Sequence, residues 1–226
     1  MSALVEIQDI SKIYNPGENE VRALDHISLT IQKGEFVAII GQSGSGKSTL
    51  MNMIGCLDVP TEGTYILNGQ NVSKLSDNEL SDIRNQEIGF IFQGFNLIAN
   101  LTAQENVELP LIYRGVPKKE RHELSVAALK KVGLAHRMDH RPSEMSGGQQ
   151  QRVAIARAIA QAPPVILADE PTGNLDSASS MEILDILKQL HAENRTVILI
   201  THDNDIAKQA KRVIRIKDGK IERDYE

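Results

Sequence analysis

The chain has 226 residues, of which 41% are hydrophobic, and 25 Lys and Arg against 30 Asp and Glu give a net charge of −5. This length and balance suffice for a packed core and exclude a disordered chain, a collagen-like repeat and a disulfide-rich mini-protein. The single cysteine, Cys56, excludes an internal disulfide and a cysteine-based zinc knuckle. The acidic net charge, with four Tyr, four Phe and no Trp, argues against a general nucleic-acid binder.

The sequence also bears on membrane segments and targeting. The longest apolar runs, Phe36–Ile40 and Val197–Ile200, are far shorter than the ~20 residues that span a bilayer. Met1–Ile10 lacks the basic region that opens a secretory signal. We therefore expect a soluble, cytoplasmic domain.

The first third of the chain predicts strand, turn and strand. Leu4–Ile7 and Ile27–Ile31 alternate apolar and polar residues, as half-buried strands do. The polar cluster Asn15-Pro16-Gly17-Glu18-Asn19 between them predicts a turn.

Three continuous apolar runs predict strands buried on both faces: Phe36–Ile40, Val165–Ala168 and Thr196–Ile200. Enough chain for a helix lies between them, and Ser48–Leu57 and Ala178–His191 have helical apolar spacing. Buried strands that alternate with helices indicate βαβ units and a parallel sheet.

The middle of the chain differs from both ends. Residues 102–161 contain no convincing buried strand, and their apolar residues are spaced helically, with Gly133 expected just past one helix end. We interpret this stretch as a helical insertion into an α/β core. Val213–Ile216 followed by Asp218-Gly219 predicts a final strand that enters a hairpin turn.

A glycine-rich loop follows the first buried strand. Gly41-Gln42-Ser43-Gly44-Ser45-Gly46-Lys47-Ser48-Thr49 matches the P-loop pattern G-x-x-x-x-G-K-[ST] in full. Glycines allow successive N–H groups to point at phosphate oxygens, and the helix that follows adds its positive end. Lys47 would contact the β- and γ-phosphates and Ser48 would ligate Mg²⁺. A flexible Gly/Ser loop with an incidental lysine would lack the flanking strand and helix, so we predict binding of a nucleoside triphosphate.

Polar residues follow three of the apolar strands. Asp169 and Glu170 follow the apolar run that starts at Val165. In P-loop NTPases an aspartate at the end of such a strand holds Mg²⁺. The adjacent Glu170 could activate the attacking water. His202 follows the run Thr196–Ile200 and Gln93 follows Ile88–Phe92, at strand ends where open α/β sheets bind ligands. On their own, these residues could equally be solvated strand termini.

A second glycine-containing motif, Ser146-Gly147-Gly148-Gln149, precedes an expected helix over Gln151–Ala160. Locally it is typical of a helix N-cap. Together with the P-loop it resembles the signature of ABC-type ATPases. The other motifs of that family follow in its order: Gln93 as the Q-loop, Asp169 and Glu170 as the Walker B pair, Asn174-Leu175-Asp176 as the D-loop, His202 as the switch. Tyr14 stands where the family has an aromatic residue that stacks on adenine, although ordinary packing would also explain it.

This resemblance implies an α/β fold with a P-loop NTPase (RecA-like) core, a mostly parallel sheet, an N-terminal antiparallel β subdomain and an inserted helical subdomain. It implies one domain over residues 1–226, with the core in 1–93 and 162–226 and the helical part in 94–161. The implied cofactors are ATP and Mg²⁺, with Ser48, Gln93 and Asp169 at the metal and Lys47, Gln93, Glu170 and His202 as catalytic residues. Family members pair head to tail, so that Ser146, Gly147, Gly148 and Gln149 would contact the γ-phosphate held by Lys47 of a second copy.

Three segments narrow the resemblance within the family. Leu50–Thr64, Gly89–Gln93 and Ala168–Ser177 are similar to the MacB and lipoprotein-release (LolD-type) branch, as is the polar insert Asn15–Arg22, and cell-division FtsE proteins are close relatives. The branch implies a MacB- or FtsX-like permease, in some members a periplasmic adaptor and an outer-membrane channel, and a place on the inner face of the cell membrane.

Two departures from the branch stand out. Met145 replaces the commoner leucine before the signature, a volume-conserving change. No permease segment follows residue 226. We therefore expect either a separate subunit or the ATPase part of a longer chain.

A soluble ABC ATPase that acts on DNA or ribosomes is the main alternative. Repair and chromosome-maintenance members have a long coiled coil between P-loop and signature, whereas about a hundred residues without sustained heptads separate Gly41 from Ser146 here. Translation-associated members carry two cassettes, and this chain has one of each motif. A kinase or other P-loop enzyme would leave the signature unexplained. The sequence favours the transport ATPase and leaves its cargo open.

Overall fold

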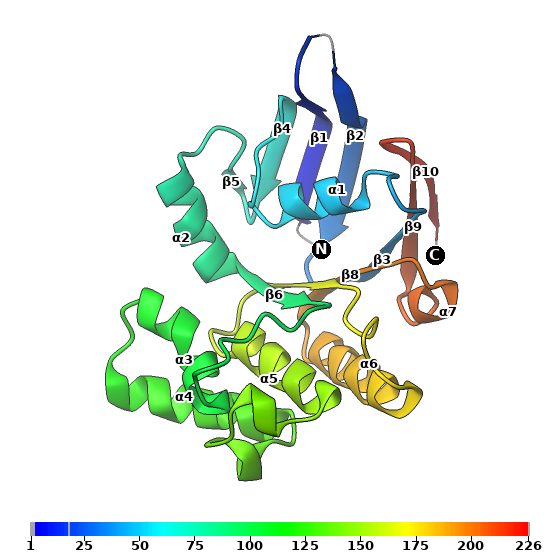
Figure 1. Cartoon of the computed structure of the whole chain (residues 1–226). Coiled ribbons are helices and arrows are strands. Elements are labelled where there is room, and N and C mark those ends of the chain that lie inside the picture. Colours follow the sequence, from blue (N-terminus) through cyan, green and yellow to red (C-terminus); the bar gives the residue numbers. More distant parts are fainter. Residues whose placement is uncertain (1–2, 18, 226) are drawn as a thin grey trace. The chain divides into compact units, whose positions relative to one another are not determined.

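The computed structural model describes residues 3–17 and 19–225, so Glu18 of the predicted turn lies outside the described residues. The chain forms two compact units (Figure 1). Unit 1 consists of Met1–Arg84 and Asn194–Glu226, and unit 2 of Asn85–Glu193. The helical part expected at residues 94–161 lies within unit 2. That these residues form a subdomain with those bounds stays a prediction. No helix among the described residues is long and apolar enough to cross a membrane.

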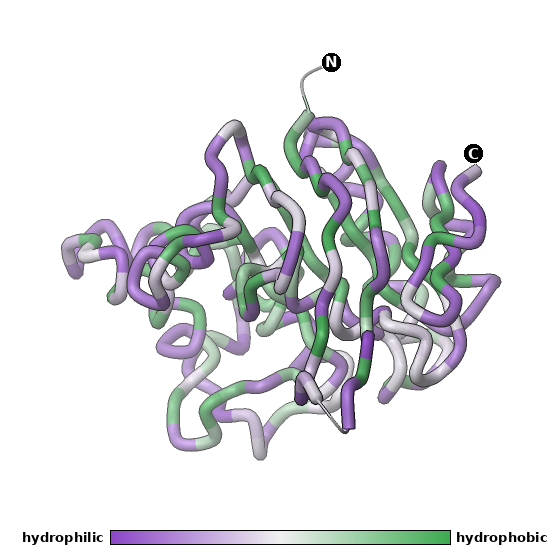
Figure 2. Tube along the Cα trace, turned by 90° about the horizontal axis from the view of Figure 1, so that it is seen from above, coloured by the Kyte–Doolittle hydropathy of each residue, from purple (hydrophilic) through white to green (hydrophobic). Residues whose placement is uncertain are grey.

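An antiparallel sheet forms the N-terminal part of unit 1. Its strands are β1 (Ala3–Tyr14), β2 (Val21–Gln32), β4 (Glu62–Leu67) and β5 (Gln70–Asn71), in the order β2-β1-β4-β5. β1 and β2 extend well beyond the ranges predicted for them, because β-bulges interrupt the alternation of apolar and polar residues along each strand. Asp9 and His26 have positive φ at these irregularities. The hydropathy colours alternate along the strand that leads away from the N-terminal marker in Figure 2.

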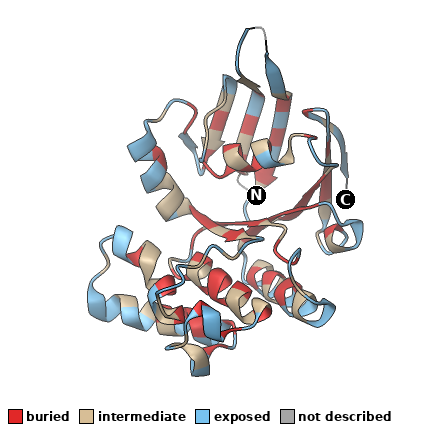
Figure 3. Cartoon of the chain, viewed as in Figure 1, coloured by how far each residue is buried: buried red, intermediate tan, exposed pale blue. Residues whose placement is uncertain are grey.

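A second group of strands in unit 1 is mostly parallel. β3 (Phe36–Ile40) pairs in parallel with β8 (Thr196–Thr201) and with β9 (Arg212–Lys217). β10 (Lys220–Tyr225) is antiparallel to β9, which confirms the predicted hairpin. All residues of β3 and β8 are buried, as their continuous apolar runs predicted (Figure 3). Burial of each large aliphatic side chain here contributes ~1.5–3 kcal/mol.

The helices of unit 1 connect its strands. α1 (Lys47–Ile54) follows β3, and α7 (Asn204–Ala207) follows β8. α2 (Asp77–Glu87) begins in unit 1, has Leu80 as its one buried residue and was not expected from the sequence. Its polar composition gives it no apolar stripe, so periodicity alone misses it.

Unit 2 combines two parallel strands, β6 (Ile88–Phe92) and β7 (Val165–Asp169), with four α-helices. The helices are α3 (Ala103–Tyr113), α4 (Lys118–Lys131), α5 (Gly147–Ile159) and α6 (Ser177–Ala192). Two short 3₁₀ helices, Ala135–Arg137 and Pro142–Glu144, lie between α4 and α5. Gly133 follows the end of α4 at φ 74°, as predicted. α5 starts at Gly147, four residues earlier than the predicted Gln151, because Ser146 and Gln149 form a capping box.

Candidate functional site

The P-loop of unit 1 joins the end of β3 to the start of α1, and close packing on its outer side requires its glycines. Gly44 and Gly46 have φ of 78° and 104°, where side chains with a Cβ are strained. A Cβ on Gly46 would lie 2.6 Å from the Ala23 carbonyl oxygen, and one on Gly41 would lie 2.4 Å from that of Ile216. The Lys47 ammonium donates to the carbonyl oxygens of Gly41 at 2.6 Å and Gln42 at 2.8 Å, so it stays at the loop.

The donors of this loop fit a chain of phosphates. The first N–H groups of α1 have no partner inside the helix and form its positive end. The Ser45 hydroxyl is buried and has no hydrogen-bond partner among the described residues, so a phosphate oxygen would satisfy it. Ser43 in the loop and Ser48 in the first turn of α1 are exposed. A nucleoside triphosphate therefore fits the residues present.

The strand register places His202 at the same sheet edge as the P-loop. Ile40 at the end of β3 pairs with Thr201 at the end of β8. The next residues in the chain are Gly41 and His202, and the His202 side chain is exposed. The structure thus brings together these two parts of unit 1 that the sequence predicted from separate strand ends.

Tyr14 lies beside the first turn of α1 in a polar cluster of unit 1. Its hydroxyl donates to Asp58 Oδ2 at 3.0 Å, and Lys12 Nζ contacts Asp58 Oδ1 at 2.6 Å. The same ammonium lies 5.1 Å from the Tyr14 ring centroid, within cation–π range. Burial and the Asp58 carboxylate raise the pKa of the Tyr14 phenol above its usual value, opposed in part by a hydrogen bond with Thr49. The phenol is therefore neutral and its ring is held in one place.

This cluster makes stability depend on pH. Burial alone would raise the pKa of the Asp58 carboxyl, but hydrogen bonds from Lys12, the Val59 N–H and Tyr14 hold it below its usual value. A lowered folded-state pKa stabilises the fold above the unfolded value of ~3.9, and this contribution disappears as pH falls through the folded pKa. We expect Asp58→Asn to lower Tm most at about pH 6–7 and the gap from the unchanged protein to narrow as the pH falls below the unfolded value of ~3.9.

The measurement is thermal unfolding by circular dichroism across that pH range. Asp185→Asn is the matched control, since Asp185 contacts Lys188 only at 3.7 Å on an exposed helix face. Its Tm should follow the unchanged protein at every pH. A gap for Asp58→Asn that is constant from neutral to acid pH would contradict the prediction.

In unit 2, the register of β6 and β7 brings the acidic pair and Gln93 to one strand edge. Phe92 pairs with Asp169, so Gln93 and Glu170 are the residues that follow at that edge. Glu170 has φ 43°, a conformation that costs a residue with a side chain ~1–3 kcal/mol and is concentrated at functional sites. The Gln93 amide donates to Asn174 Oδ1 at 3.2 Å, and the Asn174 amide donates back to the Gln93 carbonyl at 3.1 Å.

The signature motif forms the N-terminus of α5. The Ser146 hydroxyl accepts from the Gln149 N–H at 3.3 Å, and Gln149 Oε1 accepts from the Ser146 N–H at 3.0 Å. A Cβ on Gly148 would lie 2.7 Å from Ser179 Oγ, so this helix start requires glycine to pack against α6. The motif is thus a glycine-rich helix N-terminus, as the P-loop is, and can receive an anion.

Two residues that anchor these loops were not assigned a role from the sequence. Gln151 is fully buried and donates to the carbonyl oxygens of Phe92 at 3.3 Å and Pro171 at 2.7 Å. Arg157 donates to the carbonyl oxygens of Asn96 at 2.6 Å and Phe95 at 3.0 Å, and burial lowers the pKa of its guanidinium. Both lie on α5, so the signature helix holds the segments next to Gln93 and Glu170. Gln151 stands among polar residues, and a charged Arg157 is expected to face water, so the sequence gave no signal for either contact.

The P-loop on a parallel α/β framework defines a P-loop nucleoside triphosphatase. A family model described as ABC transporter matches residues 24–173. The chain is 57% identical over 218 residues to the macrolide export ATP-binding/permease protein MacB of Hyphomonas neptunium, covering 96% of this chain and 34% of that protein. It is 55% identical over 218 residues to YvrO of Bacillus subtilis, an uncharacterized ABC transporter ATP-binding protein, covering 96% of this chain and 95% of that one.

Two solved structures of the ABC transporter cassette MJ0796 superpose with a TM-score of 0.90, each covering 98% of both chains. One is described as dimeric, at 48% identity, and the other as a dimeric post-hydrolysis state bound to ADP and Pi, at 47%. The chain belongs to the ABC transporter family, and it is an ATP-binding and ATP-hydrolysing domain of that family. The predicted family and fold class are confirmed. The chain spans 34% of the length of the MacB relative, about a third.

Proposed function

We propose that this domain hydrolyses ATP to drive a MacB-like membrane permease. The observation that carries the proposal is that one chain has two glycine-rich helix N-termini, at α1 and at α5, in separate units. One is the P-loop and the other is the family signature. The high identity to MacB over 96% of this chain supports the transport branch.

The residue roles follow from the chemistry of each side chain. Lys47 and the loop from Gly41 to Thr49 hold the phosphates, and Tyr14 stacks on the adenine. Ser48, Gln93 and Asp169 would hold Mg²⁺, because their side chains offer the oxygen ligands that this ion prefers. When bound, Mg²⁺ neutralises charge that develops on the phosphates. Glu170 orients and deprotonates the attacking water, and His202 contacts the γ-phosphate.

Two copies pair head to tail when ATP binds. In this pair, the signature of one copy contacts the γ-phosphate bound at the P-loop of the other copy. The signature residues are Ser146, Gly147, Gly148 and Gln149. The dimeric structure of the MJ0796 cassette supports this arrangement. ATP then stabilises the closed pair, and hydrolysis releases it. This is a two-state equilibrium shifted by a ligand.

The partner is a MacB- or FtsX-like permease, either separate or on the same chain, and the domain lies on the inner face of the cell membrane. A periplasmic adaptor and an outer-membrane channel would join through that permease. The segment after Gln93, which Arg157 anchors to α5, is the proposed contact with the permease.

The test uses Glu170→Gln, which keeps the shape of the side chain and removes the base. With ATP and Mg²⁺ we expect this variant to form a stable dimer, because ATP binds and hydrolysis is slowed ~10²–10⁴-fold. Light scattering reports the mass. The double variant Glu170→Gln/Lys47→Ala is the control and should remain a monomer. A Glu170→Gln variant that stays monomeric in saturating ATP and Mg²⁺ would contradict the proposed dimer.

The same tagged variant identifies the partner when it is captured from detergent-solubilised cells. We expect a permease with a few membrane spans and a large external domain to remain bound. Capture of ribosomes or DNA without a membrane protein would instead support the soluble ABC ATPase as the alternative, and the proposal of a transport role would be wrong.

A further inference from the structure

The hairpin turn between β9 and β10 packs directly against the outer side of the P-loop. The Gly219 N–H donates to the Ser45 carbonyl oxygen at 2.9 Å. A Cβ on Gly46 would lie 3.3 Å from the Gly219 Cα, and one on Gly41 would lie 2.4 Å from the carbonyl oxygen of Ile216 in β9. Both ends of the loop are therefore supported by the same C-terminal hairpin.

The bond to Ser45 fixes the direction of a phosphate-binding donor. A peptide unit is planar and trans, so its C=O and N–H point in opposite directions. Because the Ser45 carbonyl points outward to Gly219, the Gly46 N–H of the same peptide unit points to the opposite, inner side of the loop. Rotation of this one peptide unit would remove an N–H group from the concave side that binds phosphate.

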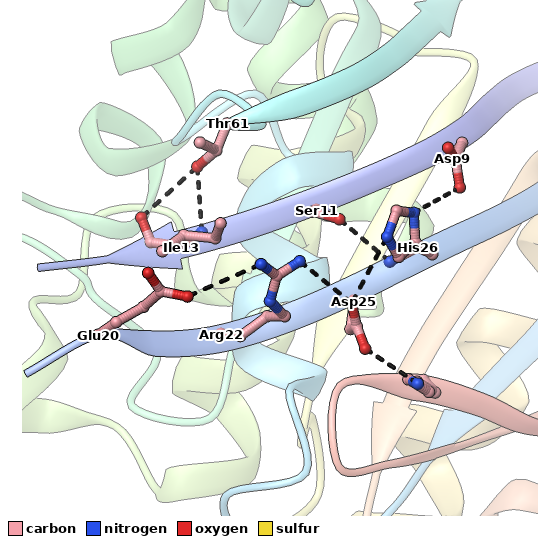
Figure 4. A network of polar contacts seen from close by, with 9 residues as sticks. Asp9, Ser11, Ile13, Glu20, Arg22, Asp25, His26 and Thr61 are labelled. Atoms are coloured by element: carbon pink, nitrogen blue, oxygen red, sulfur yellow. Dashed lines mark hydrogen bonds and ion pairs between the residues drawn. The ribbon is translucent and has the colours of Figure 1, made fainter. Parts of the chain in front are cut away.

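The turn is itself held in place by the bulged region of β2. The Asp25 N–H donates to the Gly219 carbonyl oxygen at 2.9 Å, and Lys220 Nζ lies 3.0 Å from Asp25 Oδ2. Arg22 also contacts the Asp25 carboxylate, at 3.3 Å (Figure 4). Gly219 thus connects β2 on its carbonyl side to the P-loop on its N–H side.

We propose that Gly219 is a positioning residue for the nucleotide phosphates, acting through the Ser45–Gly46 peptide unit. A glycine is required for two reasons. Its φ is 74°, and a Cβ would lie 3.0 Å from the Ala23 carbonyl oxygen and 3.3 Å from the Leu24 Cα. The side chain would press on Ala23 and Leu24 of β2 and so displace the turn that holds the Ser45 carbonyl. The inference rests on the P-loop being the nucleotide site, and it adds to that site a residue far along the chain.

The chain contains a matched control in a second hairpin. The β4–β5 turn has Asn68 at φ 48° and Gly69 at φ 81°, and the β9–β10 turn has Asp218 at φ 48° and Gly219 at φ 74°. A Cβ on Gly69 would meet nothing within 4 Å. Gly69→Ala and Gly219→Ala therefore introduce the same backbone strain. Only Gly219→Ala also disturbs the turn that supports the P-loop.

The experiment is calorimetric titration of the purified chain with ADP and Mg²⁺, with Tm recorded for each variant. We expect Gly219→Ala to raise the Kd about tenfold, since small displacements of binding groups are costly, and Gly69→Ala to leave it within about twofold. Both variants should lose Tm, and Gly219→Ala more, because its Cβ also meets Ala23 and Leu24. Gly219→Asn and Gly69→Asn repeat the comparison with a residue that tolerates positive φ, and so separate strain from contact.

Equal Kd values for the Gly219 and Gly69 variants would overturn the inference while leaving nucleotide binding by the P-loop intact. Absence of ADP binding by the unchanged chain would overturn the nucleotide site and this inference with it. A raised Kd for both Gly219 variants, with neither Gly69 variant affected, would support it.

Discussion

Replacement of Lys47 by alanine is expected to lower the rate of ATP hydrolysis at least about a hundredfold, the scale of losing one charge-stabilising donor. The Lys47 ammonium is held by the carbonyl oxygens of Gly41 and Gln42, which keep its charge at the phosphate-binding loop. Alanine removes the charge and leaves only uncharged donors, the loop N–H groups and hydroxyls such as that of Ser45. The measurement is steady-state release of phosphate with Mg²⁺ and ATP.

Lys33→Ala is the matched control for this prediction, because Lys33 is exposed in the turn before β3. It should retain the rate of the unchanged chain, and both variants should keep their far-ultraviolet circular dichroism. A Lys47→Ala variant that hydrolyses ATP at the normal rate would show that another cation neutralises the phosphates.

Asn106→Ala is expected to lower the free energy of unfolding by about 3 kcal/mol. Asn106 in α3 is fully buried, and its side chain makes four hydrogen bonds to the backbone of the preceding segment. Its Oδ1 accepts from the Ile98 N–H at 2.8 Å, and its amide donates to the carbonyl oxygens of Ile98, Leu101 and Thr102. Alanine leaves these groups without their partner and opens a cavity.

The measurement is urea unfolding of the purified chain. Asn85→Ala provides the control, since the Asn85 side chain makes a single hydrogen bond among the described residues, to the Pro110 carbonyl at 3.1 Å, and we expect a loss of about 1 kcal/mol. Equal losses for the two variants would contradict the prediction. Because Asn106 shapes the segment that we propose contacts the permease, its loss should also weaken permease association.

The sequence alone was sufficient for elements whose signal is local. Phe36–Ile40 has the bounds that its apolar run predicted, because a strand buried on both faces requires an unbroken run, and β6 has the bounds of the apolar run Ile88–Phe92. The P-loop and the signature were identified because each is a pattern of consecutive residues, although the close contacts at Gly46 and Gly148 come from the distant residues Ala23 and Ser179. The Asp218-Gly219 hairpin followed from the preference of those residues for positive φ.

The tertiary structure decided what depends on distant partners. The bulges that extend β1 and β2 and the polar helix α2 leave no apolar period to detect. The contacts that position the site also join residues far apart in the chain: Tyr14 with Asp58, Gln151 with Pro171, and Ser45 with Gly219. A residue's own type and spacing report its local backbone preference and its exposure to water, whereas a hydrogen bond between distant segments depends on where the fold places both partners. The sequence therefore determined the chemistry of this protein, and the packing of its strands and loops decided which residues hold that chemistry in position.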